Sequence, residues 1–187
     1  MKSRLPDPLR LDLLSFTADA AELAGEWAGD ELTRLADSQS PLQDTQLSAV
    51  GWRLSGERVA VPVGEPEIWL KLQASTLAWL TCQRCLQPFQ ELLDVDQRLR
   101  FVRDEAQAET LDAESEDDVL ALPRWLDARE LIEDELLLAL PLVPRHPHCP
   151  TALPMSGQAT HDEAHAERLN PFAVLQGLKL PLKSGKG

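Results

Sequence analysis

The chain has 187 residues, of which 31 are Asp or Glu and 18 are Lys or Arg, and its net charge is -13. That length suits one domain, or one domain with a tail. Phosphate binding needs clustered positive charge, so the acidity argues against a large nucleic-acid surface. It favours either a basic protein partner or plain solubility. There is no apolar run of membrane-spanning length and no signal-peptide h-region, so we expect a cytoplasmic protein without a membrane partner.

The first sixty residues predict short elements. Thr17 can cap a short helix that Gly25 ends, and residues 26–28 can form a brief strand. A second short helix is predicted over residues 30–36, where the early acids suit its positive end. Strands are then predicted over 46–54 and 58–63, separated by the turn signal Ser55-Gly56-Glu57.

Two long strands are predicted on either side of a short polar turn at about 82–88. Apolar positions recur with a period of two from Ile68 to Leu80 and again from Phe89 to Phe101. Successive side chains of a strand point to opposite faces, so this period is typical of half-buried strands. The pattern predicts a long antiparallel hairpin with Cys82-Gln83-Arg84-Cys85 at its tip.

The best helix signal lies in the C-terminal half, over residues 127–140. Asp127 is a good N-cap residue, and Ile132, Leu136 and Ala139 form one apolar face that can cover the sheet. Three consecutive acids, at 133–135, lie within this predicted helix. Adjacent helix positions point in different directions, so we interpret these acids as solvated rather than catalytic.

The fold class predicted from these elements is α+β, with one domain over residues 1–150. Its antiparallel sheet, built on the long hairpin, is packed by the C-terminal-half helix and the short N-terminal helices. Residues 104–118 contain eight acids and no Lys or Arg, so we expect an acidic flexible loop at about 103–118. Residues 151–187 are expected to be a partly disordered tail with a short apolar and basic docking segment.

The three cysteines and a neighbouring histidine raise the question of a metal. Cys82-x-x-Cys85 and His146-x-x-Cys149 share one spacing, and two such turns can supply a structural zinc site. His148 is the alternative to His146. Two interpretations remain open beside it: reduced structural thiols in a hairpin turn, and a redox pair, which is less favoured away from a helix N-terminus. We expect no catalytic residue and no required cofactor, with structural zinc as the one candidate.

Three motifs occur in a fixed order along the chain: CQRC at 82–85, EDELLLALPLVP at 133–144 and NPFAVL at 170–175. Together they closely resemble the bacterial YceD family, the large ribosomal RNA subunit accumulation proteins. Some relatives are richer in cysteine after the Leu-Pro motif, where this chain has His146, His148 and Cys149.

The resemblance implies a non-enzymatic ribosome-biogenesis factor that supports the synthesis, processing or stability of large-subunit (23S) ribosomal RNA. The expected partner is a ribosomal protein or a large-subunit assembly factor, with ribosomal RNA contacted directly or indirectly. No catalytic residues are established for the family, so none is transferred to this chain. An RNA-processing enzyme or a direct RNA-binding protein is the alternative.

Overall fold

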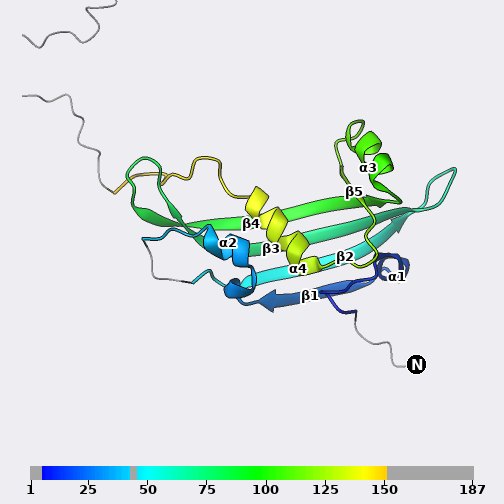
Figure 1. The fold of residues 1–187 in the computed structure, drawn as a ribbon, viewed down its shortest axis with the longest axis horizontal. Helices are drawn as coiled ribbons and strands as arrows, with labels where there is room; N and C mark the ends of the chain where they lie inside the picture. The colour runs from blue at the N-terminus through cyan, green and yellow to red at the C-terminus, as the bar shows by residue number, and fades with distance from the viewer. Residues whose placement is uncertain (1–5, 43–45, 151–187) are drawn as a thin grey trace, which may run out of the picture. The chain divides into compact units, whose positions relative to one another are not determined.

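Residues 6–42 and 46–150 are described by the computed structural model, and they belong to one compact unit. Five strands form one sheet in the order β1-β2-β3-β4-β5 (Figure 1). The strands are β1 (Glu22–Trp27), β2 (Val50–Val59), β3 (Glu67–Thr81), β4 (Pro88–Val102) and β5 (Asp118–Ala121). All neighbours are antiparallel except β4 and β5, which are parallel. The predicted α+β class is therefore confirmed, with a mostly antiparallel mixed sheet.

Two predictions concern parts of the chain beyond the sheet. The tail predicted over residues 151–187 lies outside the described residues. Across the residues that are described, no helix is long and apolar enough to cross a membrane.

The long hairpin lies where the alternation predicts it. Thr81 pairs with Pro88 next to the tip, and the ladder continues without a break to Ile68 and Phe101. In this register the apolar residues of both strands reach the same face of the sheet, because side chains alternate. The most deeply buried of them are Leu70, Leu72, Leu93 and Leu99.

One face of the sheet is covered by helices (Figure 1). Helix α4 (Ala128–Leu138) begins where predicted, since the Asp127 carboxylate accepts hydrogen bonds from the N–H groups of Arg129 and Glu130. Ile132 and Leu136 of α4 are fully buried. Ala139, which we expected on the same buried face, is instead the exposed C-cap. Helix α2 (Thr33–Asp37) packs beside α4.

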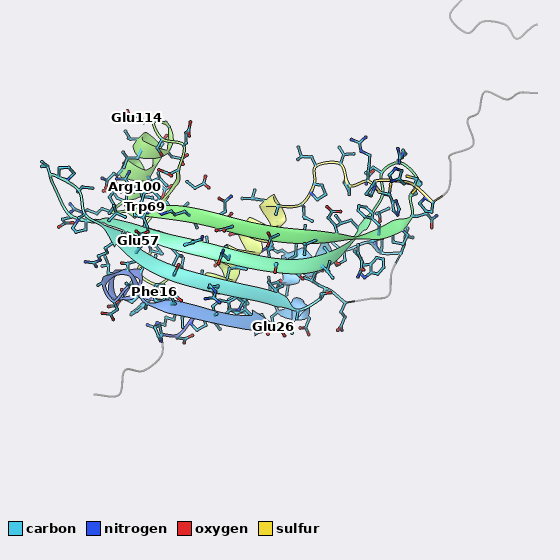
Figure 2. All side chains as sticks on the ribbon, turned by 180° about the vertical axis from the view of Figure 1, so that it is seen from behind. Phe16, Glu26, Glu57, Trp69, Arg100 and Glu114 are labelled. Carbon is cyan, nitrogen blue, oxygen red and sulfur yellow. The ribbon has the colours of Figure 1, made fainter. Side chains whose placement is uncertain are left out.

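Neither α2 nor α4 lies on the opposite face of the sheet (Figure 2). Trp69 lies on this face but is only 5% exposed, because the Arg98 guanidinium lies 4.1 Å from its ring centroid and Arg100 lies 5.9 Å away. Arg98 also forms an ion pair with Glu57 at 3.0 Å. Stacked cations and cross-strand ion pairs thus cover apolar surface that would otherwise need a second layer.

The first helix differs from its prediction. Helix α1 spans Leu13–Ala18 and is capped by Asp12, whose side chain accepts from Leu14 and Ser15. The residues predicted to be helical after Thr17 form strand β1 instead, since they pair with β2. Pairing with a neighbouring strand overrides the helical propensity of an alanine-rich segment. The second short helix is present as a 3-10 turn (Gly29–Glu31) followed by α2.

Strand β2 is continuous through the turn predicted at residues 55–57. Gly56 is there for a different reason, which is the close approach of α1. A Cβ atom on Gly56 would lie 2.8 Å from Phe16 Cδ1 and 3.0 Å from the Phe16 carbonyl oxygen. The predicted turn was therefore wrong, and the separate strand over 58–63 is reduced to the end of β2 at Val59.

Helix α3 (Glu105–Asp112) stands within the acidic segment where a flexible loop was expected. Asp104 caps it by accepting a hydrogen bond from the Gln107 N–H. Its one deeply buried residue, Ala108, packs with Val102 and Val119 in a small second core. The segment then forms β5, a fifth strand that its sequence pattern did not predict. Few apolar residues suffice here, because the end of β4 supplies the surface they pack on.

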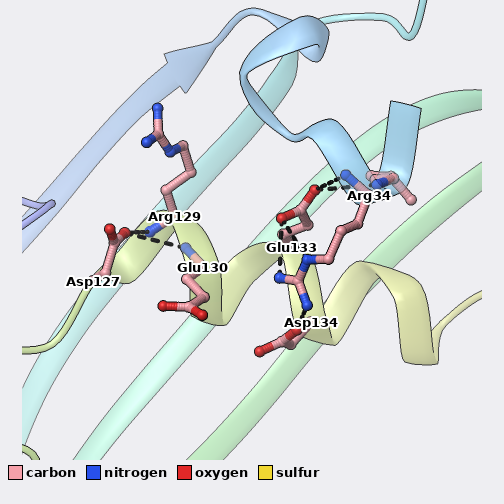
Figure 3. Close-up of polar contacts among 7 residues, drawn as sticks. Arg34, Asp127, Arg129, Glu130, Glu133 and Asp134 are labelled. Carbon is pink, nitrogen blue, oxygen red and sulfur yellow. Dashed lines mark hydrogen bonds and ion pairs between the residues drawn. The ribbon is translucent and has the colours of Figure 1, made fainter. Parts of the chain in front are cut away.

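Glu133 has a structural role that the sequence did not reveal (Figure 3). Its side chain is buried, and one carboxylate oxygen accepts hydrogen bonds from the N–H groups of Arg34 at 2.7 Å and Leu35 at 3.1 Å. The Arg34 guanidinium bonds the other oxygen at 3.0 Å. Helix α2 has no capping side chain of its own. Glu133 therefore caps α2 from a distant part of the chain, and our interpretation of this acid as solvated was wrong.

We expect Glu133→Ala to lower the free energy of unfolding by about 3 kcal/mol, because it leaves buried N–H donors of α2 without an acceptor. Urea denaturation of the full chain measures this change. Asp134→Ala is the matched control, since the Asp134 carboxylate is half exposed and bonds only Arg34. That control should cost about 1 kcal/mol or less. Equal losses in the two variants would contradict the capping role.

Candidate metal centre at the hairpin tip

The turn between β3 and β4 meets the segment that follows α4. Cys82 and Cys85 lie in the turn, whereas His146 and Cys149 lie after the helix. Two contacts attach the second segment to the first. The Gln83 N–H donates to the Pro144 carbonyl at 2.8 Å, and the His146 ring centroid lies 4.9 Å from that of Phe89. The structure therefore brings together two pairs of side chains that are more than sixty residues apart in sequence.

The four donor atoms have the spacing of a tetrahedral site. All of them lie within 4.8 Å of one another. The Sγ atoms of Cys82 and Cys149 are 3.7 Å apart, and Cys85 Sγ is 3.4 Å from His146 Nδ1. Zinc bonds of about 2.3 Å to sulfur and 2.0–2.1 Å to nitrogen require edges of about 3.8 Å and 3.6 Å in a regular tetrahedron. These two distances match the required edges, so the residues present fit a zinc ion once the remaining pairs, which lie within 4.8 Å, close by about 1 Å at most.

Backbone N–H groups favour the thiolate form of one cysteine. Burial alone would raise the pKa of Cys82, but hydrogen bonds from the N–H groups of Cys85, His146 and Arg84 outweigh it and lower the pKa to about 5. Burial raises the pKa of Cys85, and the nearby thiol groups of Cys149 and Cys82 add to the effect. Thiolates repel one another in such a cluster, and a bound cation removes that repulsion.

Arg84 lies beside the cluster and is not one of its four donors. Its Nε donates a hydrogen bond to Cys149 Sγ at 3.0 Å, and this contact raises the pKa of Arg84 above its usual range. A donor to a ligating sulfur orients that ligand and balances its charge. The sequence showed Arg84 in the turn, but it could not show that the guanidinium reaches a sulfur 65 positions further along.

The turn is tight enough to strain a residue that is not glycine. Leu86 follows Cys85 and has a φ of 59°, in the left-handed region. Its N–H donates to the Cys82 carbonyl at 2.8 Å, which closes the turn around the sulfur atoms. A side chain in this region costs about 1–2 kcal/mol.

The structure separates the two histidine candidates. His146 belongs to the group of four, whereas His148 is exposed and lies outside that group. All three cysteines are free thiols, and the pair in the hairpin turn lies between antiparallel strands. Redox-active cysteine pairs of the thioredoxin type lie at a helix N-terminus, which lowers a thiol pKa. This pair does not lie at a helix N-terminus.

The fold and the cluster together define an acidic α+β protein with a cysteine–histidine knuckle at the tip of its longest hairpin. Residues 70–179 match the sequence model of the family described as "Large ribosomal RNA subunit accumulation protein YceD". A Haemophilus influenzae protein of the same description is 30% identical over 175 residues, which cover 92% of this chain and 95% of that protein. The chain belongs to the YceD family. No solved structure matches it.

The region matched by the family model begins within β3 and contains the hairpin tip, α4 and all four residues of the cluster. Strands β1 and β2 and helices α1 and α2 precede it. The part of this chain that carries the family's pattern is thus the part that builds the knuckle.

We expect Leu86→Gly to raise the free energy of unfolding by about 0.5–1 kcal/mol, because glycine adopts a positive φ without steric cost and this gain exceeds its larger chain entropy. Thermal or urea unfolding of the full chain measures the change. Leu86→Ala is the control, since it keeps the Cβ atom and should give no gain. If both variants were equally stable, the left-handed residue would not store strain.

Proposed function

We propose that this chain supports the accumulation of large-subunit ribosomal RNA as a non-enzymatic factor that acts through a basic protein partner. Membership of the YceD family is the observation that carries the proposal, since the family's description names accumulation of this RNA and no reaction. The net charge of -13 supports a protein partner of opposite charge. The same charge disfavours a broad contact with phosphates.

The two groups of side chains most suited to catalysis, the buried acid Glu133 and the cysteine–histidine cluster, both have structural roles. The buried carboxylate of Glu133 is occupied by the N-terminus of α2 and by Arg34. The cluster at the hairpin tip offers four protein donors, which fill a tetrahedral metal and leave no open position for a substrate or a water molecule. Such closed sites stabilise folds rather than activate reactants.

We further propose that the cluster holds a structural zinc ion through Cys82, Cys85, His146 and Cys149. The donor set and its distances support zinc, because three sulfur atoms and one imidazole suit this metal better than calcium or magnesium. When bound, the ion supplies bonds that tie the segment after α4 to the hairpin tip. Arg84 then balances one unit of the excess thiolate charge.

In cells that lack this protein, the ratio of large-subunit to small-subunit ribosomal RNA should fall, and the gene supplied on a plasmid should restore it. The small-subunit RNA serves as the internal reference. An unchanged ratio would refute the proposed function. Incubation of the purified protein with precursor RNA and Mg²⁺ tests the non-enzymatic part, and specific cleavage there would refute that part alone.

Elemental analysis of the purified full chain should find about one zinc ion per molecule. Cys149→Ala and His146→Ala should weaken zinc binding by more than the roughly 10- to 100-fold loss typical of residues behind the ligands. His148→Ala is the matched control and should bind zinc normally. Competition with a chromophoric chelator measures the three affinities. Equal affinities for the His146 and His148 variants would exclude His146 as a ligand.

A further inference from the structure

Strand β4 has a long edge that no strand of the described residues covers. The short strand β5 pairs only with residues 99–102 of β4, while β4 itself begins at Pro88 (Figure 1). Within residues 6–42 and 46–150, β3 is the only strand in register with residues 92–98, and β5 first pairs at Leu99, next to the end of this stretch. We call residues 92–98 the open edge of β4. Such an edge presents a row of unpaired N–H and C=O groups to any strand of matching chemistry.

A groove runs beside the open edge. It has a volume of about 360 Å³ and lies between residues 94–97 of β4 and the C-terminal end of α4. Leu138 of α4 forms part of its wall and is 79% exposed. The groove therefore combines unpaired backbone groups with an apolar contact, which are the two elements that an added strand uses.

The charge of the groove is uniformly negative. Asp94, Asp118 and Glu135 line it, and none of the three has an ion-pair partner among the residues that the structure describes. Asp96 also lines it but is paired with Lys71 at 3.3 Å. The C-terminal end of α4 adds the negative pole of the helix dipole. A strand bound here must therefore carry positive charge.

The free protein bears a cost at this position that a cation would remove. Burial raises the pKa of Glu135, and the nearby Asp118 and Asp134 carboxylates raise it further. Acids that only prevent another strand from pairing with an exposed edge lie on the edge strand itself and are exposed. They do not require a partly buried acid on a neighbouring helix. Glu135 is such an acid, so the groove resembles a binding surface rather than a protected edge.

We propose that an extended segment of a partner protein, rich in Lys and Arg, binds the open edge of β4 as an additional antiparallel or parallel strand. This inference rests on the proposed function and specifies how the basic partner is held. Main-chain hydrogen bonds join the segment to residues 92–98. Basic side chains at successive positions of the segment reach Asp94 and Asp96 on one face and Asp118 and Glu135 on the other, because neighbouring strand residues point to opposite faces.

The same charges argue against other occupants. A second copy of this chain would bring its own carboxylates opposite Asp94 and Asp118, and like charges across a strand pair are destabilising. A nucleic acid would place phosphates next to these acids. Of these three occupants, the basic peptide is the one that satisfies both the backbone groups and the carboxylates.

The test uses the full chain and a ten-residue synthetic peptide in which pairs of lysines alternate with pairs of valines, so that lysines lie on both faces of the added strand. Hydrogen exchange of the β4 amides is followed by NMR with and without the peptide. Outward-facing amides of residues 92–98 should exchange about 10-fold more slowly when the peptide is bound. Residues 99–102 are the internal control, since β5 already pairs with them.

Two controls separate strand addition from general attraction between opposite charges. A peptide with the same sequence but N-methylated at alternate residues cannot complete the ladder and should protect no amide. The double variant Asp118→Asn with Glu135→Gln should bind the original peptide about 5-fold more weakly, as expected for two exposed ion pairs. The matched variant Glu26→Gln with Asp30→Asn changes the net charge equally, in and just after β1 at the opposite edge of the sheet, and should bind normally.

Several results would overturn the inference. Equal binding of the methylated peptide would mean that charge alone is recognised. Slow exchange of residues 92–98 in the free protein would mean that the edge is already covered, by another part of the chain or, if protection rises with concentration, by a second copy. Protection by a short single-stranded RNA in place of the peptide would assign the edge to nucleic acid.

The peptide assay and the cellular assay test different proposals, so a negative result in one does not decide the other. Failed peptide binding with a ribosomal RNA ratio that still depends on the protein rejects only the open edge. Normal peptide binding with an RNA ratio that does not depend on the protein rejects only the proposed function. The groove variant links them: if it loses peptide binding in vitro, it should lower the RNA ratio in cells.

Discussion

The register between β3 and β4 is the constraint on which the rest of the structure depends. Fourteen residue pairs join the two strands without a bulge. A shift by one residue would turn every buried leucine of one strand to the opposite face, because side chains alternate. It would also move Cys82 and Cys85 relative to each other and destroy the tight turn that encloses the sulfur atoms. The hydrophobic pattern of the hairpin thus fixes the geometry of its tip.

Much of this arrangement could be predicted because its information is local. The period of two in the hairpin and the capped apolar face of α4 are each contained in one stretch of sequence. The elements that were mispredicted depend on distant contacts. Gly56 looks like a turn residue until Phe16 is packed against it, and the alanine-rich segment after Thr17 looks helical until β2 is placed beside it.

The candidate site divides in the same way. Equal spacing in two short motifs was enough to select the four residues that the structure brings together. Spacing favoured His146 but left His148, two positions further on, as the alternative. That choice is made by the Gln83–Pro144 hydrogen bond and the Phe89 ring, which fix the path of the second segment. Nor could any local pattern reveal that Glu133 caps another helix, since its partners lie about one hundred positions away.

This distant cap also has a consequence for the order of events during synthesis. A ribosome makes Arg34 and Leu35 about one hundred residues before Glu133, and a five-residue helix without a cap is not stable alone. Helix α2 therefore waits, unfolded, until α4 has left the exit tunnel and docked on the hairpin. The N-terminal part of this protein is made first and completes its fold last.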